Sequence, residues 1–386
     1  MRGMRRIRIL PDVVANQIAA GEAVERPASV VKELGENALD AKARHVEVAI
    51  GRGGKRRIRV SDDGVGMGRE DALLCLDRHA TSKIEEASDL TGVMTFGFRG
   101  EAMPSIAAVS RMTVETWDGE EESGTRVTVA GGQISNVTDV ARRRGTTVDV
   151  KNLFYNAPVR ARFLKSVSAE ARAVNEAATA LALANPRVGF RLTSDDRVLL
   201  DLPASTDLAE RVTQIWGMEH GETLIPAAGQ VDVMEVKGLI QRPDAAKPGL
   251  RRNHFFVNGR PFRSTEIVRA AERGYRTTIP QGVRPWMFLY LRLPGDGVDV
   301  NVHPTKAEGR CRDLARVEAR GEAAVRSARD AEASAATFDR EVGAPALVVK
   351  EGSGGHAPRL ETADSPPETT SADAQMALFV SSAEPS

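Results

Sequence analysis

The clearest amphipathic pattern in the chain begins at Pro27, which suits the first turn of a helix because its missing amide hydrogen would go unpaired there. Apolar residues then recur at helical spacing and predict a helix over 27–40: Val30, Val31, Leu34 and Ala38. A polar stripe with the spacing i, i+3, i+4 and i+7 follows another face: Glu33, Glu36, Asn37 and Asp40. In an isolated helix such a stripe is usually solvated, and the pattern alone leaves that alternative open.

Alternating apolar residues predict the strands around this helix. Residues 45–50 and 57–60 form a hairpin around the glycine-rich turn 51–54. Further strands are expected at 111–117, 124–130 and 145–152, a helix at 169–184, and a second hairpin at 189–193 and 197–201. Shorter helices are expected at 12–20, at 69–78 and from Pro104. These elements predict an α+β domain over 1–205.

A second run of elements begins near residue 205. Helices are expected at 208–216 and 265–275, with strands at 231–240, 254–257 and 286–293. A strand from 298 ends at Pro304, which leaves Lys306 on a loop, and a charged helix follows to about 336. We therefore expect a second α/β domain over 206–335 and a disordered, acidic, Ser/Pro-rich tail over 336–386.

Composition fits two domains in a chain of 386 residues. Net charge is zero overall, but residues 351–386 contain six acidic residues and one basic one, so the body carries the opposite charge of +5. The basic clusters of the body indicate either a nucleic-acid surface or ordinary solubility. The two cysteines, Cys75 and Cys311, lie far apart, which favours a reducing cytoplasm without disulfides or a zinc site. No apolar run approaches membrane-spanning length.

Glycine-rich loops are the natural place to look for phosphate chemistry. The loop 64–68 lacks the dinucleotide spacing, and the loop 51–55 is too short for a Walker A motif. A third arrangement fits better: a carboxylate at a strand end (Asp62) accepts from an exocyclic amine, while Gly64 and Gly66 let a planar base approach the backbone. Glu33 can then polarise a water, and Asn37 can offer magnesium a hard oxygen ligand.

This order of features resembles the GHKL ATPases and, within them, the MutL family of DNA mismatch repair proteins. The resemblance implies a GHKL (Bergerat) ATPase α/β sandwich followed by a ribosomal-protein-like α/β transducer domain. It runs from about Ile7 to Arg329, over both predicted domains. The segments that carry it are 15–22, 25–34, 78–83, 97–102, 153–156, 256–260 and 299–306.

The resemblance also implies roles for individual residues, with ATP and Mg²⁺ as cofactors. Glu33 would be the general base, Asn37 the magnesium ligand and Asp62 the contact to the adenine amino group. Thr146 would support Asp62, and Lys306 would contact the γ-phosphate from the second domain. A lid that orders on ATP would include Lys83, Gly97, Phe98, Arg99 and Gly100. For Glu36 and Asp40 a solvated or lid-facing position is expected.

The implied function is that of a Mg-dependent mismatch repair ATPase. ATP binding would close the lid and pair two N-terminal domains into a homodimer, and slow hydrolysis would reset it. Implied partners are DNA, bound without sequence preference, and a mismatch-recognition protein; no membrane is involved, and the expected location is the cytoplasm, with the nucleoid during repair. The alternative is a non-hydrolysing, ATP-sensing DNA-binding scaffold. A topoisomerase-type ATPase is disfavoured, because no strand-cleaving tyrosine domain is seen.

Two further segments each allow two interpretations, one as a binding site and one without a function. Arg162 and Lys165 follow the segment 153–156 and lie either on a DNA path or on a solvated helix face. In the tail, Gln375, Met376, Leu378 and Phe379 resemble a peptide that binds the replication sliding clamp, although five residues in a biased tail also arise by chance.

The sequence departs from the family pattern at three places. Gly35 stands where a branched apolar residue is usual, and Gly309-Arg310-Cys311 stands where Val-Arg-Phe is usual. Both changes remove apolar burial, so we expect a less stable fold and a higher melting temperature for Gly35→Val. The family also normally carries a C-terminal dimerisation domain, in many lineages with an endonuclease metal motif. Neither is visible here, which predicts no endonuclease activity and weak dimerisation without nucleotide.

Overall fold

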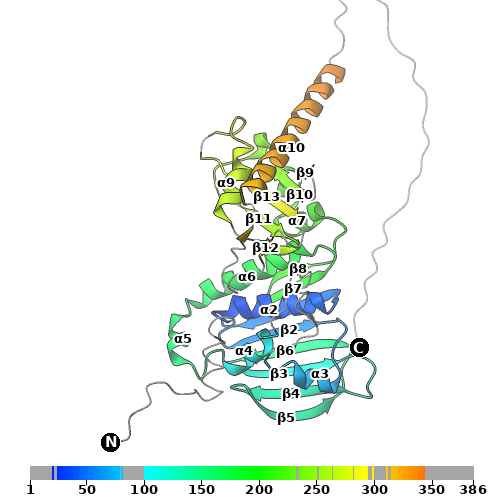
Figure 1. Ribbon diagram of the computed structural model, residues 1–386, viewed down its shortest axis with the longest axis vertical. Coiled ribbons are helices and arrows are strands. Elements are labelled where there is room, and N and C mark those ends of the chain that lie inside the picture. The colour runs from blue at the N-terminus through cyan, green and yellow to red at the C-terminus, as the bar shows by residue number, and fades with distance from the viewer. Residues whose placement is uncertain are drawn as a thin grey trace, which may run out of the picture. The chain divides into compact units, whose positions relative to one another are not determined.

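The computed structural model describes residues 20, 24–78, 80, 100–231, 234–249, 252–262, 264–280, 282–293, 298–299, 310–311 and 314–343. The chain divides into two units after Phe338, and the elements described below belong to the first of them, apart from the last residues of α10. The first unit contains two large mixed sheets with helices packed against them (Figure 1). The α+β class is thereby confirmed, while the boundary near residue 205, which falls between β8 and α7, stays a prediction.

The larger sheet has eight strands in the order β5-β4-β3-β6-β2-β1-β7-β8. The strands are β1 (His45–Gly51), β2 (Arg57–Asp62), β3 (Arg111–Trp117), β4 (Gly124–Ala130), β5 (Gln133–Val140), β6 (Gly145–Lys151), β7 (Gly189–Ser194) and β8 (Arg197–Leu202). Neighbours are antiparallel except β1 and β7, which run parallel. Burial alternates along β1, β2 and β3, so one face of the sheet is covered and the other is exposed.

Helices cover the buried face of this sheet (Figure 1). They are α2 (Pro27–Asp40), α3 (Arg69–Leu74), α4 (Ala102–Ala108) and α6 (Val167–Ala184). The predicted apolar face of α2 packs inward, with Val30 and Val31 fully buried in the same core as Ile58 of β2. At the start of α2, both Nε and Nη2 of Arg26 donate to Glu170 of α6, at 3.0 and 2.9 Å, which ties the two helices together.

Gly35 has a packing role that the sequence did not reveal. It is buried where α2 crosses α6, and a Cβ added at this position would lie 2.5 Å from Cδ1 of Leu181. Leu181 is itself buried, so it fills the volume that a larger residue at position 35 would occupy. The expectation that Gly35→Val raises the melting temperature is therefore not supported, because the change overpacks this crossing.

The second sheet has five strands in the order β12-β11-β13-β10-β9. The strands are β9 (Leu224–Val231), β10 (Met234–Gln241), β11 (Asn253–Val257), β12 (Arg260–Phe262) and β13 (Met287–Arg292). The helices of this part are α7 (Leu208–Trp216), α8 (Met218–Gly221), α9 (Thr265–Arg273) and α10 (Leu314–Gly343), with a 3-10 turn at Pro243–Ala245. A two-stranded sheet joins β14 (Val298–Asp299) to β15 (Arg310–Cys311).

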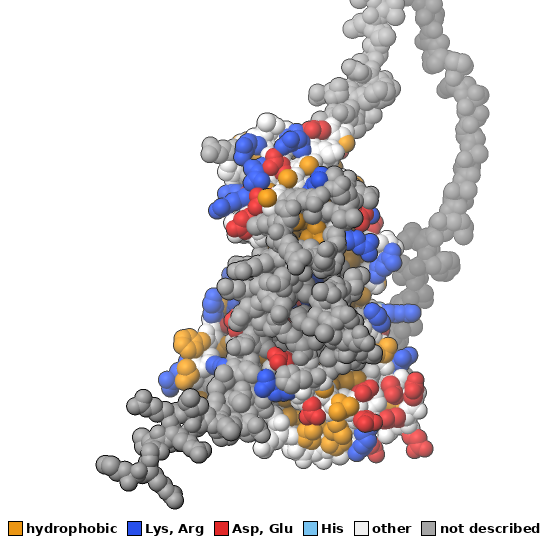
Figure 2. All heavy atoms as spheres, in the orientation of Figure 1, with side chains coloured by type: hydrophobic (Ala, Val, Ile, Leu, Met, Phe, Trp, Pro, Cys, Tyr) orange, Lys and Arg blue, Asp and Glu red, His pale blue; other side chains and the backbone are white. Residues whose placement is uncertain are grey.

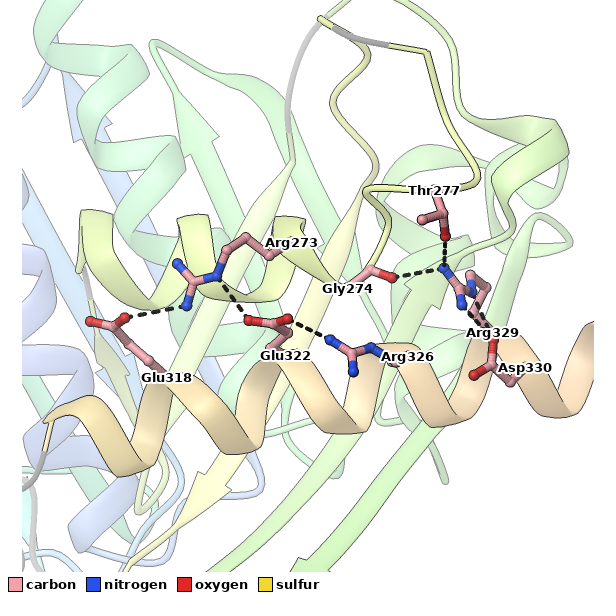
Figure 3. Close-up of polar contacts among 8 residues, drawn as sticks. All are labelled: Arg273, Gly274, Thr277, Glu318, Glu322, Arg326, Arg329 and Asp330. Carbon is pink, nitrogen blue, oxygen red and sulfur yellow. Dashed lines mark hydrogen bonds and ion pairs between the residues drawn. The ribbon is translucent and has the colours of Figure 1, made fainter.

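Helix α10 is held by both apolar and charged contacts. Val317, Ala324 and Val325 lie in the core formed by the second sheet and α9. Beside them, Arg273 of α9 pairs with Glu322 at 2.8 Å and with Glu318 at 3.4 Å (Figure 3). Further along, Arg329 donates to the carbonyl of Gly274 (Figure 3).

Helices α6 and α7 share an apolar cluster with the second sheet: Leu183, Val212, Leu239, Phe256 and Phe288. The Tyr290 hydroxyl donates to the carbonyl of Leu183 across this junction. Arg211 of α7 is fully buried and donates to the carbonyls that precede β7, including that of Val188 at 2.7 Å. Polar and apolar contacts thus connect the end of α6 with the second sheet.

Most predicted elements are confirmed, and the exceptions have physical causes. β5 is an edge strand whose residues are mostly exposed, so it shows no alternating pattern. α5 (Pro158–Phe163) has no buried residue and therefore no apolar face to detect. The strand expected at 231–240 is β10, and its partner β9 was missed. The helix expected at 12–20 lies outside the described residues apart from its last one. In the part of the chain that the structure describes, no helix combines the length and apolarity needed to cross a membrane.

Candidate nucleotide-binding site

The polar stripe of α2 faces away from the core of the large sheet. Glu33 and Asn37 lie one helical turn apart and are both half-buried. The Glu33 side chain keeps 21% of its exposure, and its Oε1 accepts from the ammonium of Lys32 at 3.1 Å. A carboxylate and an amide side chain therefore lie one helical turn apart at partly exposed positions.

Glu36, expected to be solvated or lid-facing, is instead buried, with 4% of the residue exposed. Burial raises its pKa to about 7, against the opposing charges of Lys32 and Arg260. Lys32 pairs with Glu36 at 3.1 Å, one turn along the same helix. The solvated interpretation is wrong for Glu36 because cations on α2 and on β12 compensate its carboxylate.

Asp62 ends β2 and is held from two sides. Its Oδ1 accepts from the backbone N–H of Gly64 at 2.9 Å, and the backbone N–H of Thr146, its register partner on β6, also donates to the carboxylate. Burial raises the pKa of Asp62, while these N–H groups and the charge of Arg142 oppose the rise. The Thr146 hydroxyl lies 3.0 Å from that of Thr116. The structure thus places Thr146 beside Asp62, the two residues that the family resemblance links.

The loop after Asp62 is anchored at the end of α2. The N–H of Val65 donates to the carbonyl of Ala41 at 2.9 Å, which is one turn beyond Asn37. A Cβ at Gly64 would lie 2.6 Å from that carbonyl, and Gly66, at φ +73°, lies against the carbonyl of Trp117. These glycines are therefore required by the packing of the loop itself. The anchor places the Asp62 loop at the same end of the helix as Asn37.

Several predicted site residues lie outside the described residues: Lys83, Gly97, Phe98, Arg99, Lys306, Gln375, Met376, Leu378 and Phe379. Gly100 is described, with φ +60°, and a Cβ there would lie 2.5 Å from the carbonyl of Ala80. α4 begins two residues later, at Ala102, with no side-chain cap at its N-terminus. Among the described residues, no side chain caps the N–H groups of that first turn, a feature shared by helix ends that bind anions.

Arg162 and Lys165 belong to a different surface. Both are exposed, on α5 and directly after it. Two apolar side chains of α5 are also exposed, Val159 at 65% and Phe163 at 81%. Figure 2 shows basic and apolar side chains together where α5 lies in Figure 1. This surface combines positive charge with an exposed aromatic ring, so it is compatible with nucleic acid as well as with solvent.

Sequence reasoning missed two residues of the site, Lys32 and Arg260. The i, i+4 spacing of Lys32 and Glu36 is a signal for the first. Arg260 lies in the segment 256–260 that carries the family resemblance, but no spacing links it to α2. The charges of Glu36, Asp40 and Glu33 all act on Arg260, whose pKa is lowered by burial against them.

Comparisons with known proteins agree with this geometry. A family described as "Histidine kinase-, DNA gyrase B-, and HSP90-like ATPase" matches residues 25–151, which include α2 and Asp62. A second family, "DNA mismatch repair protein, C-terminal domain", matches residues 212–329. The two matches cover strands β1–β6 of the large sheet and all five strands of the second sheet, with α8, α9 and parts of α7 and α10.

Similar relatives of this chain are DNA mismatch repair proteins named MutL. The chain is 49% identical over 325 residues to the DNA mismatch repair protein MutL of Gemmatimonas aurantiaca, covering 84% of this chain and 53% of that protein. It is 49% identical over 307 residues to the MutL of Anaeromyxobacter dehalogenans strain 2CP-C, covering 80% and 50%. The chain therefore spans about half the length of these relatives.

Solved structures of DNA repair proteins share the fold of this chain. The N-terminal domain of a DNA repair protein matches with a TM-score of 0.72 at 23% identity, over 83% of this chain and 99% of that one, which shows a shared fold. The Aquifex aeolicus MutL ATPase domain complexed with ADP is 31% identical, with a TM-score of 0.55, over 70% of this chain and 93% of that one. The chain belongs to the MutL family of DNA mismatch repair proteins and contains its GHKL-type ATPase domain.

Proposed function

We propose that this chain binds and hydrolyses ATP and that it does so in DNA mismatch repair. The observation that carries the proposal is the position of Glu33 and Asn37, one turn apart on α2, beside a loop that presents Asp62 and is anchored at the end of the same helix. One face of one helix then offers a base and a metal ligand, and the adjacent strand end offers an acceptor for the adenine amino group.

Each residue has a role in the proposed reaction. Asp62, steadied by the N–H groups of Gly64 and Thr146, accepts from the adenine amino group. Glu33 accepts a proton from the water that attacks the γ-phosphate. Lys83, Gly97–Gly100 and Lys306 are proposed as lid and γ-phosphate contacts on the family resemblance.

The chemistry of the donor set fits magnesium. Mg²⁺ is usually held by one or two protein oxygens together with substrate phosphates and waters. The side-chain oxygen of Asn37, a half-buried residue, meets this requirement, and the half-buried Glu33 one turn away adds a carboxylate to the same face. When bound, the ion would neutralise developing charge on the transferred phosphoryl group.

The alternative, a scaffold that senses ATP without turning it over, is separated from this proposal by one experiment. Equilibrium binding and single-turnover hydrolysis of Mg-ATP are measured for the wild type and for Glu33→Ala. We expect both proteins to bind ATP and the variant to hydrolyse it more slowly by a factor of about 10² or more. A wild type that binds ATP but hydrolyses it no faster than Glu33→Ala would favour the scaffold.

In mismatch repair, ATP binding is proposed to pair two copies of the domain and to prepare a surface for DNA and for a mismatch-recognition protein. The exposed basic surface at α5 is the part of the described structure that suits DNA. Clamp binding by residues 375–379 is a separate proposal. A tail peptide that fails to bind the clamp, or that binds equally well with Phe379→Ala, would exclude it.

A further inference from the structure

Lys32 occupies an unusual position for a residue with no part in the reaction as described so far. Its ammonium lies 3.1 Å from Oε1 of Glu33, the proposed base, and 3.1 Å from Oε2 of Glu36. A single cation on α2 therefore joins a residue that faces the ligand to a carboxylate that is buried.

Glu36 is a firm anchor for this cation. Its side chain is only 6% exposed, whereas that of Glu33 is 21% exposed, so packing fixes the position of Glu36. A hydrogen bond from the ammonium restricts the rotamers of the flexible Glu33 side chain. This bond therefore limits the orientations that the Glu33 carboxylate adopts.

A second cation compensates the same acidic cluster. Arg260 of β12 interacts electrostatically with Glu36, Asp40 and Glu33, which brings a positive charge from the second sheet to α2. Lys32 is therefore not the sole counter-charge of Glu36 among the described residues. A role for Lys32 toward Glu33 can be separated experimentally from simple neutralisation of Glu36.

We propose that Lys32 is a positioning residue for ATP hydrolysis: anchored on Glu36, it holds Oε1 of Glu33 and so directs Oε2 toward the attacking water. This inference rests on the proposed function. In the reaction, Oε2 takes a proton from the water as the water oxygen bonds to the γ-phosphorus. The bond from that phosphorus to the β,γ-bridging oxygen breaks, and ADP leaves with its electron pair.

The competing explanation is structural, namely that Lys32 only neutralises the buried carboxylate. Lys32→Met alone does not distinguish the two, because it also leaves Glu36 with one cation fewer. The double variant Lys32→Met/Glu36→Gln does, because it removes both charges and keeps a polar side chain at position 36. Lys32→Arg keeps the charge and the reach, and Lys151→Met removes an exposed lysine paired with Asp149 at 3.5 Å.

The test measures kcat, KM, nucleotide Kd and melting temperature for these variants in the full chain. We expect Lys32→Met and the double variant to lower kcat by about 10- to 100-fold with unchanged nucleotide Kd. The double variant should melt like the wild type, Lys32→Arg should recover most of kcat, and Lys151→Met should behave as the wild type.

Three results would overturn the inference: wild-type kcat in Lys32→Met, recovery of kcat in the double variant, or a parallel loss of nucleotide affinity. Each of these presupposes an active wild type, so they differ from a failure of the proposed function. A wild type that binds ATP without hydrolysing it would contradict both the proposed ATPase and this role of Lys32.

Discussion

Asp62 is the residue proposed to accept a hydrogen bond from the adenine amino group, so its protonation state should affect nucleotide binding. Its carboxylate accepts from an amino group more strongly when ionised than when protonated, and burial raises its pKa above the ordinary value of about 3.9. In the free protein, nucleotide affinity should therefore fall on acidification at a pH higher than an ordinary aspartate would give. Calorimetric titration with ADP across the acidic range measures this.

The neighbouring Asp63 provides a matched control. It accepts from the N–H groups of Arg44 and His45 and from the ring of His45, and it holds the start of β1. Asp62→Asn should weaken binding by about 10-fold or more and abolish the pH dependence, while Asp63→Asn should leave both in place. If Asp63→Asn lost nucleotide binding and Asp62→Asn kept it, the contact to the adenine amino group would belong to Asp63 and not to Asp62.

A second prediction for a single residue concerns Gly35. The structure predicts that Gly35→Val lowers the stability of the fold, whereas the sequence predicted that it raises it. Gly35→Val should lower the free energy of unfolding by about 1–3 kcal/mol, because its side chain meets the buried Leu181. In a Leu181→Ala background the same change should be stabilising, since the vacated volume accepts it. Urea unfolding of the four proteins tests this, and a stabilised Gly35→Val single variant would refute it.

Helix α10 allows apolar and ionic contributions to be compared on one element. Val325 is fully buried, and a Cβ at Gly274 would lie 2.7 Å from it, so the packing there is tight. Glu322 joins two arginines in a partly exposed network (Figure 3). Val325→Ala should cost about 1–3 kcal/mol, and Glu322→Ala about 1 kcal/mol or less, with only the latter cost shrinking in high salt. A larger cost for Glu322→Ala would mean that ion pairs fix the helix.

At the scale of elements, the sequence predicted those helices and strands that have one buried face and one exposed face. α2 and β1–β3 have a buried face and an exposed face, so their periodicity is visible. β5 and α5 are exposed nearly throughout and left no such pattern. Gly35 could not be interpreted because its partner Leu181 is brought to it only by the crossing of α2 and α6.

The same limit applies to the site. Glu33 and Asn37 were predicted from helical spacing together with the family resemblance, Asp62 from its place at a strand end together with that resemblance, and Thr146 from the resemblance alone. The buried state of Glu36 was missed because it depends on Arg260, which reaches α2 from the second sheet. Long-range compensation of a charge has no signature in local sequence.

For the whole molecule, the basic surface at α5 predicts the salt dependence of DNA binding. Arg162→Glu/Lys165→Glu should weaken DNA binding and reduce the salt slope by about 0.7–0.9 for each phosphate that the protein no longer neutralises. The matched double variant Arg191→Glu/Arg197→Glu changes the same charge on exposed positions of β7 and β8. Equal weakening in both variants would mean that net charge alone drives binding, and that α5 is a solvated face.

The central claim is that α2 and the end of β2 form one nucleotide site, and a crystal structure with a non-hydrolysable ATP analogue and Mg²⁺ tests it most directly. The account predicts the adenine amino group within about 3 Å of the Asp62 carboxylate. It also predicts Mg²⁺ at about 2.1 Å from the side-chain oxygen of Asn37, with a water between Glu33 and the γ-phosphate. Adenine bound away from Asp62, or a metal ion held without Asn37, would contradict it.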